Sequence, residues 1–254
     1  MSELKITDKY LPFGGLNIRY LETGSGSPTL LLHALNPRSC AEEWLDTMQM
    51  FKAYDRHVFA IDMPGWGLSE GPTDGRYHFS IWIETIKHFC ETFEFDRVDI
   101  VGRTMGGWVA ALFAHQYPAL VRSLVLFNNA GLNARPPLTL AQLSTMPDLD
   151  SLVKSFGSTD VAETIHTRLH QEGRVEKFKR VLDYILNQEV RDEWSLRPRL
   201  PEIHTPKLFA MKETAGEMSS QFAIEGFTLA PNSRLFLTKG TDESDPATFE
   251  LNKA

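Results

Sequence analysis

Several classes of protein are excluded by what the sequence has little of. Only two cysteines, Cys40 and Cys90, occur in 254 residues, which argues against a disulfide framework and fits a reducing compartment. No apolar run reaches the roughly 18 residues that a membrane span requires. The first 15 residues lack the basic start, apolar stretch and cleavage site of a secretory signal. We therefore expect a cytoplasmic protein.

Positively charged residues are fewer than negatively charged ones. The formal net charge is −7 at pH 7, from 26 Lys and Arg against 33 Asp and Glu. A chain of this sign is repelled by nucleic-acid backbones and by anionic membranes. Small molecules or other proteins remain as partners, and the sequence does not indicate an oligomeric state.

The first half of the chain alternates strand and helix patterns. Short apolar segments such as "LNIRYLETG", "SPTLLLHAL", "HVFAID", "DRVDIVG" and "VRSLVLF" predict strands, and "SIWIETIKHFCETF" and "TMGGWVAALFAHQYP" predict helices. Strands that alternate with helices give right-handed crossovers and a mostly parallel sheet covered on both faces. The predicted fold class is therefore α/β.

The pattern changes after Gly131. Residues 133–199 carry helical or loop signals, and strand patterns return with "PKLFAMK" and "SRLFLTKG". We interpret residues 1–132 and 200–254 as the core and residues 133–199 as a helical cap. A cap over the carboxyl ends of parallel strands is a common place for a ligand site.

The stretch "VGRTMGG" has the features of a sharp strand-to-helix turn that presents one side chain. Gly102, Gly106 and Gly107 allow the strand and the helix to pack closely and lift the side chain of Thr104 above the sheet. The backbone N–H of Met105 and one from the loop after His33 can then converge on a developing oxyanion. For that loop we expect the N–H of Leu35 to be the donor, with Asn36 beside the same pocket.

Taken together, these segments resemble the α/β-hydrolase fold family, in particular its lipase-like and ring-cleavage-product hydrolase branch. "DMPGWGLS" resembles the family's Asp-x-Pro-Gly-x-Gly-x-Ser turn, and "VGRTMGGWVAALFAHQYPALVRSLVLFNNAGL" resembles the nucleophile elbow, its helix and the next strand. The resemblance covers nearly the whole chain. It implies a central sheet, a nucleophile on the elbow, and an oxyanion hole.

The same resemblance shows where the chain departs from the family's catalytic triad. Thr104 replaces the serine nucleophile, Ala215 falls at the position of the acid, and Gly240-Thr241 stands where the family has Gly-His. No histidine occurs after His204, which precedes a strand and so belongs to the opposite edge of the sheet. Without a base and an orienting acid, covalent acyl transfer lacks its proton-transfer partner.

Other residues near the predicted site allow two interpretations each. His33 either braces the oxyanion loop or replaces the missing base. Arg103 and Lys212 either bind a carboxylate or enolate ligand, or form ion pairs with acidic neighbours. Asn128 can only offer hydrogen bonds in the pocket. The remaining candidates are acidic partners for these cations (Glu213, Asp242, Glu243), a second pocket amide (Asn129), and two cap histidines too few to hold zinc (His166, His170).

Three functions remain open on this basis. The first is a non-hydrolytic enzyme, of the lyase, isomerase, cyclase or cofactor-free oxygenase type, acting on a small hydrophobic carbonyl compound. The second is a catalytically inactive protein that binds a ligand or acts as a scaffold. The third is a weak esterase that uses Thr104. No metal and no cofactor is predicted for any of them.

Overall fold

A computed structural model of the chain describes residues 8–34, 39–132, 180–181, 183–213 and 220–239. Eight strands in this part of the chain form one sheet, in the order β1-β2-β4-β3-β5-β6-β7-β8. Strands β3 to β8 run parallel, whereas β2 lies antiparallel to both β1 and β4. The bounds are β1 Lys9–Phe13, β2 Leu16–Thr23, β3 Ser27–Leu32, β4 Arg56–Ile61, β5 Val98–Arg103, β6 Val121–Phe127, β7 Lys207–Glu213 and β8 Ser233–Lys239.

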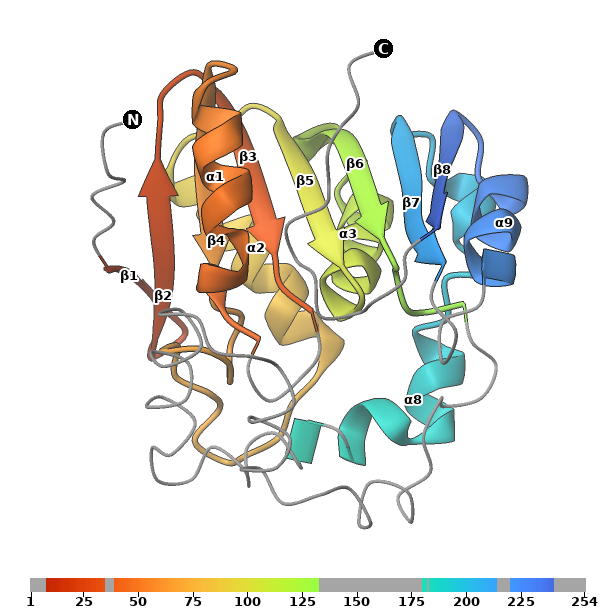
Figure 1. Cartoon of the computed structure of the whole chain (residues 1–254). Coiled ribbons are helices and arrows are strands. Elements are labelled where there is room, and N and C mark those ends of the chain that lie inside the picture. Colours follow the sequence, from red (N-terminus) through yellow and green to blue (C-terminus); the bar gives the residue numbers. More distant parts are fainter. Residues whose placement is uncertain (1–7, 35–38, 133–179, 182, 214–219, 240–254) are drawn as a thin grey trace.

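Helices cover both faces of the sheet (Figure 1). On one face α1 (Leu45–Lys52) packs through Met48 on a small apolar cluster with Leu31 and Val58. On the other face α2 (Phe79–Thr92) and α3 (Met105–Gln116) build the main core. Helices α8 (Gln188–Glu193) and α9 (Ser220–Leu229) follow later in the chain, residues 180–181 and 183–186 are also helical, and 3-10 turns occupy Ala41–Trp44, Pro118–Leu120 and Leu200–Glu202.

Burial on both faces explains why the central strands are nearly continuous apolar runs. Helix α3 is buried from Met105 to Ala114, as expected for a helix that is apolar all round. The α/β fold and the mostly parallel sheet predicted from the sequence are therefore confirmed. The hairpin of β1 and β2 was not predicted; Gly14 and Gly15 form its turn with φ of 57° and 82°, which suits two-residue hairpin loops.

The strand order places the candidate site. The chain passes from β3 to β4 on one side and then to β5 on the other side of β3, so β3 and β5 flank the point where the order reverses. In open α/β sheets, ligands bind outside the carboxyl ends of the strands at such a point. His33 follows β3 and Thr104 follows β5, so topology alone brings these two residues to that point.

Most of the predicted cap, residues 133–179 and 182, lies outside the described residues, so the division into core and cap stays a prediction. Residues 194–197, at the end of the predicted cap, lie beside Trp108 and beside Gly131 and Leu132, which precede the cap. The N–H of Leu196 donates to the carbonyl of Gly131 over 2.9 Å, and the Nε of Arg197 donates to the carbonyl of Leu132 over 3.1 Å. Trp108 of α3 donates through Nε1 to the carbonyl of Trp194 over 2.8 Å. Helix α8 lies at the carboxyl ends of the parallel strands (Figure 1).

Candidate active site

The elbow between β5 and α3 is held in a strained conformation by close backbone packing. Thr104 has φ of 52° and ψ of −108°, a region that a β-branched residue rarely adopts. A Cβ on Gly102 would lie 2.4 Å from the carbonyl oxygen of Gly106, and one on Gly106 would lie 2.3 Å from that of Leu32. Only glycine fits at these two positions, so the strand and the helix fix the turn between them.

The backbone and the side chain of Thr104 differ in their hydrogen bonding. Its N–H donates to the carbonyl of Phe127 over 2.9 Å, and its carbonyl accepts from Trp108 over 3.2 Å and from Ala130 over 2.9 Å. The side chain is partly exposed. Within the described residues the hydroxyl has no hydrogen-bond partner.

The start of α3 provides an anion-binding feature beside that hydroxyl. The first N–H groups of a helix have no partner within the helix, and the helical bonds of α3 begin where Trp108 donates to Thr104. In the described part of the chain, no residue accepts a hydrogen bond from the N–H of Met105. This donor is therefore available for an oxyanion. The second expected donor, Leu35, and its neighbour Asn36 lie outside the described residues.

His33 is fully buried and both of its ring nitrogens are engaged. Nε2 accepts a hydrogen bond from the N–H of Met63 over 3.1 Å. Because a backbone N–H can only donate, the proton of a neutral ring lies on Nδ1, which donates to the carbonyl of Ala34 over 2.8 Å. In this arrangement neither nitrogen is directed to the hydroxyl of Thr104.

The other described histidines have partners elsewhere. His57 contacts Glu22 over 2.7 Å, His88 contacts the carbonyl of Pro12 over 2.9 Å, and His115 contacts Glu202 over 2.8 Å. His78 packs on the ring of Tyr184 with centroids 5.3 Å apart, and His204 is exposed before β7. His166 and His170 lie outside the described residues.

Two predicted pocket residues occupy the ends of neighbouring strands. The guanidinium of Arg103 stacks over the ring of Phe127 at 5.8 Å and has no carboxylate partner in the described part of the chain. Asn128 follows β6 in a left-handed conformation with φ of 43°, and its N–H donates to the carbonyl of Ala210.

The other predicted site residues are not described in the same detail. Lys212 pairs through its backbone with Thr238 of β8, but its side chain, like that of Glu213, lies outside the described part. Thr241, Ala215, Asp242 and Glu243 lie outside it too. Among the described residues, no group of three or more His, Cys, Asp or Glu side chains is placed to hold a metal ion.

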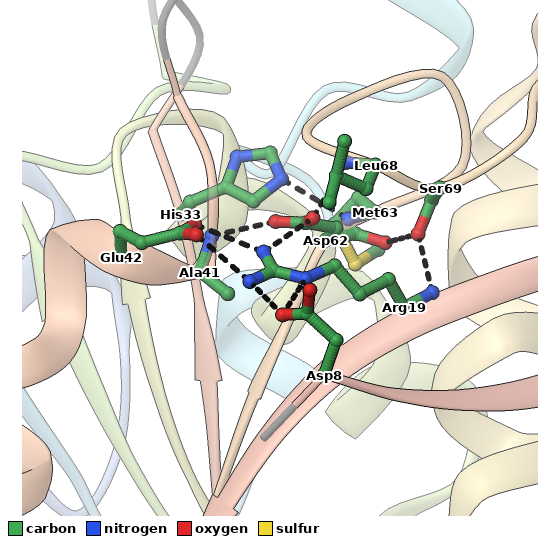
Figure 2. A network of polar contacts seen from close by, with 9 residues as sticks. All are labelled: Asp8, Arg19, His33, Ala41, Glu42, Asp62, Met63, Leu68 and Ser69. Carbon is green, nitrogen blue, oxygen red and sulfur yellow. Dashed lines mark hydrogen bonds and ion pairs between the residues drawn. The ribbon is translucent and has the colours of Figure 1, made fainter. Parts of the chain in front are cut away.

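A polar network that was not predicted from the sequence joins β2 to the residues that follow β3 and β4 (Figure 2). Its centre is Arg19 of β2, whose side chain is 1% exposed. The guanidinium donates to Glu42 over 2.8 and 2.9 Å, to Asp62 over 2.9 Å, and to Asp8 over 2.5 and 2.8 Å. Burial alone would lower the pKa of Arg19, but its bonds to Glu42 and the charge of Asp62 raise it, so the guanidinium stays charged.

Asp62 connects this network to the turn of residues 62–69. Its carboxylate accepts from the N–H of Ala41 over 2.6 Å and from that of Leu68 over 2.7 Å. A Cβ on Gly67 would lie about 2 Å from the same carboxylate, so the turn closes tightly on it. In the "DMPGWGLS" motif, the carboxylate of Asp62 therefore accepts hydrogen bonds from backbone N–H groups around it, and the turn is closed around this side chain.

The network also affects Cys40. Burial, reinforced by the carboxylates of Asp62, Glu42 and Glu43, raises the pKa of its thiol well above the ordinary value. The residue is 3% exposed. A protonated, buried thiol is a poor nucleophile, so Cys40 is not a candidate nucleophile.

The match to known families agrees with this geometry. Residues 28–177 match the model of the alpha/beta hydrolase fold family, which is more than half of the chain. The chain belongs to the α/β hydrolase fold family. No described helix is long and apolar enough to cross a membrane.

Several similar sequences are named as hydrolases. The chain is 32% identical over 120 residues to a 2-hydroxymuconate semialdehyde hydrolase of Pseudomonas sp., a match that covers 47% of this chain and 42% of that protein. It is 30% identical over 185 residues to a 2-hydroxy-6-oxononadienedioate/2-hydroxy-6-oxononatrienedioate hydrolase of Paraburkholderia phymatum, covering 64% of each. The chain thus spans less than half of the length of the first of these relatives.

Solved structures support the fold. The 2-hydroxy-6-oxo-6-phenylhexa-2,4-dienoate hydrolase of Rhodococcus aligns with a TM-score of 0.79 at 19% identity, over 92% of this chain and 91% of that chain. A meta-cleavage product hydrolase of Pseudomonas fluorescens aligns with a TM-score of 0.77 at 20% identity, over 93% and 90%. At this level of identity the likeness concerns architecture alone.

Proposed function

We propose that this α/β-hydrolase-fold protein lacks the catalytic triad and acts non-hydrolytically on a small hydrophobic carbonyl compound at the carboxyl edge of its sheet. One observation carries the proposal: the elbow retains a free helix N-terminus at Met105, while the hydroxyl of Thr104 has no hydrogen-bond partner among the described residues. The frame can stabilise a negative oxygen, but no described group removes the proton from the hydroxyl.

Chemistry that needs only a stabilised oxyanion fits this frame. A carbonyl oxygen held by backbone N–H groups favours transfer of the neighbouring C–H proton to solvent hydroxide or a buffer base, because the charge of the resulting enolate develops on that oxygen; the enolate then takes a proton back from solvent. Enolates are intermediates in lyase, isomerase and cyclase reactions. The names of several relatives describe oxo compounds, which supports a carbonyl ligand for this chain. In this proposal His33 braces the loop, and Leu35 supplies the second N–H donor.

The experiment measures exchange of the protons next to the carbonyl of 4-phenyl-2-butanone in D2O by NMR, with and without protein. We expect saturable exchange above the buffer rate, with equal rates in the wild type and in Thr104→Ala, because the hydroxyl takes no part. The Thr104→Ala variant is a matched control, since it keeps every backbone donor of the elbow.

The two other functions predict different results. A protein that only binds its ligand would show saturable binding of the ketone, detected as a shift of its carbonyl 13C signal, without exchange. A weak esterase would cleave a p-nitrophenyl ester and lose this activity in Thr104→Ala. Either result would contradict the proposal.

A further inference from the structure

We propose that Arg19 is a positioning residue for this site: it fixes the strand end that carries His33 against the elbow, and so sets the location of the N–H donor of Met105. The inference rests on the proposed function for its catalytic readout. It concerns a residue on β2, a strand that contributes no side chain to the elbow itself.

The hydrogen-bonding capacity of the Arg19 guanidinium is fully used. A guanidinium has five N–H donors in a fixed plane, and the structure contains five hydrogen bonds from Arg19 to Asp8, Glu42 and Asp62. Three carboxylates surround one cation, so the group is held by charge as well as by direction. Lysine, with a single charged nitrogen, cannot span the same acceptors.

The contacts continue from Arg19 to the elbow through described residues. Asp62 is held by Arg19, and the next residue, Met63, donates its N–H to Nε2 of His33. The backbone carbonyl of His33 would lie 2.6 Å from a Cβ on Gly106, so the strand end is in close contact with the first turn of α3. A shift of Asp62 is therefore expected to displace Met63 and His33, and with them the strand end that contacts Gly106 at the start of α3.

The same two side chains, Arg19 and Asp62, also hold Ala41 and Glu42. Glu42 bonds to Arg19 with both carboxylate oxygens, and Ala41 donates its N–H to Asp62. Figure 2 shows His33, Ala41 and Glu42 gathered around Arg19 and Asp62. Arg19 and Asp62 thus hold Ala41 and Glu42 directly, whereas His33 is linked to Asp62 through the backbone N–H of Met63.

The outer member of the network offers a mild perturbation. Asp8 precedes β1, and its side chain is 42% exposed, whereas Asp62 is fully buried. Asp8→Asn removes one charge and weakens the bonds to Nε and Nη2 of Arg19 without opening a cavity. Arg19→Lys keeps the charge and loses the planar geometry. Together they separate positioning from gross unfolding.

The test compares Asp8→Asn and Arg19→Lys with Arg122→Gln. Arg122 pairs with Asp99 over 2.7 Å near the amino ends of β5 and β6, so its loss perturbs an ion pair at the opposite edge of the sheet. For exchange of 4-phenyl-2-butanone we expect Arg19→Lys to lower kcat about ten-fold, since small misplacements of catalytic groups cost one to two orders of magnitude. We expect Asp8→Asn to lower kcat less than Arg19→Lys does. In both variants KM stays within about two-fold of the wild-type value, because the apolar body of the ketone is still bound. Arg122→Gln changes neither kcat nor KM.

A second measurement is independent of turnover. The amide of Met63 is protected from hydrogen exchange by its bond to His33, so we expect its protection to fall in Asp8→Asn and to remain in Arg122→Gln. The inference is overturned if kcat and Met63 protection are unchanged in Asp8→Asn, or if Arg122→Gln lowers them equally. Absence of any exchange of the ketone by the wild type would contradict the proposed function alone, and the protection of Met63 would still decide the role of Arg19.

Discussion

Two turns at the same edge of the sheet differ in how their polar groups are satisfied. In the turn of residues 62–69 the carboxylate of Asp62 accepts from Arg19, Ala41 and Leu68. At the elbow the backbone of Thr104 is fully engaged, yet its hydroxyl has no described partner. Within the described residues, the turn of residues 62–69 thus has its buried charge fully paired, whereas the elbow keeps a side-chain hydroxyl that no described group engages.

The largest expected effect on stability comes from removing the Arg19 side chain, which is paired with Asp62 in the turn of residues 62–69. Arg19→Met removes the cation paired with the fully buried carboxylate of Asp62, which costs about 3–5 kcal/mol of unfolding free energy. Urea denaturation measures the loss. As a control, Arg122→Met breaks an ion pair that is 38% exposed on the arginine side and costs about 1 kcal/mol or less. Equal losses in the two variants would contradict the special role of the Arg19 network.

A buried amine far from both turns gives a test by pH. Lys207 of β7 is 4% exposed and donates to the carbonyls of Ile203 and Pro231; burial lowers its pKa from 10.5 to about 8. The folded state then binds fewer protons than the unfolded state between these values, so raising the pH favours folding.

Measured as the difference between the wild type and Lys207→Met, stability should rise from pH 8 to pH 10.5 by up to about 3 kcal/mol. The shared thiols and tyrosines cancel in this difference. If the difference in stability between the two proteins does not change across this range, the pKa of Lys207 is not lowered in the folded state.

The packing that creates the elbow provides the next comparison. Gly106→Ala inserts a Cβ 2.3 Å from the carbonyl oxygen of Leu32, so strand and helix must move apart at a cost of about 1–3 kcal/mol. The thermal midpoint should fall accordingly. An unchanged midpoint would mean that the elbow is less tightly packed than the structure indicates.

Relief of strain at the elbow has the smallest expected effect and the opposite sign. Thr104→Gly removes a β-branched side chain from a conformation that costs about 1–3 kcal/mol, offset by the entropy that glycine adds to the unfolded chain. We expect a net gain of about 1 kcal/mol. Asn232→Gly, at φ of 50°, is the matched control and should gain less, because asparagine tolerates that region. A larger gain in the control would show that Thr104 is not strained.

The sequence was informative where a feature depends on local spacing. The glycines around Thr104 and the alternation of apolar segments predict the elbow and the parallel sheet, because both follow from contacts within a few residues or from strand burial. Helices α1 and α9 and strand β1 were missed. Of these, β1 had a usable signal, since Gly14-Gly15 between apolar residues is typical of a hairpin.

The polar network could not be predicted because it joins four distant parts of the chain. Asp8, Arg19, Glu42 and Asp62 meet only after β1, β2 and β4 have formed. A partial signal existed: Arg19 interrupts the apolar segment "LNIRYL", and a charged residue within a buried strand requires a buried partner. The sequence does not show which carboxylates provide it.

The most direct test of the account is the search for an acyl-enzyme. Purified wild type and Thr104→Ala are incubated with p-nitrophenyl butyrate, and the intact proteins are weighed by mass spectrometry while release of p-nitrophenol is followed. Without a base for the Thr104 hydroxyl, the account predicts no butyryl adduct and the same slow release from both proteins. A butyryl group on Thr104 of the wild type, with release lost in the alanine variant, would contradict it.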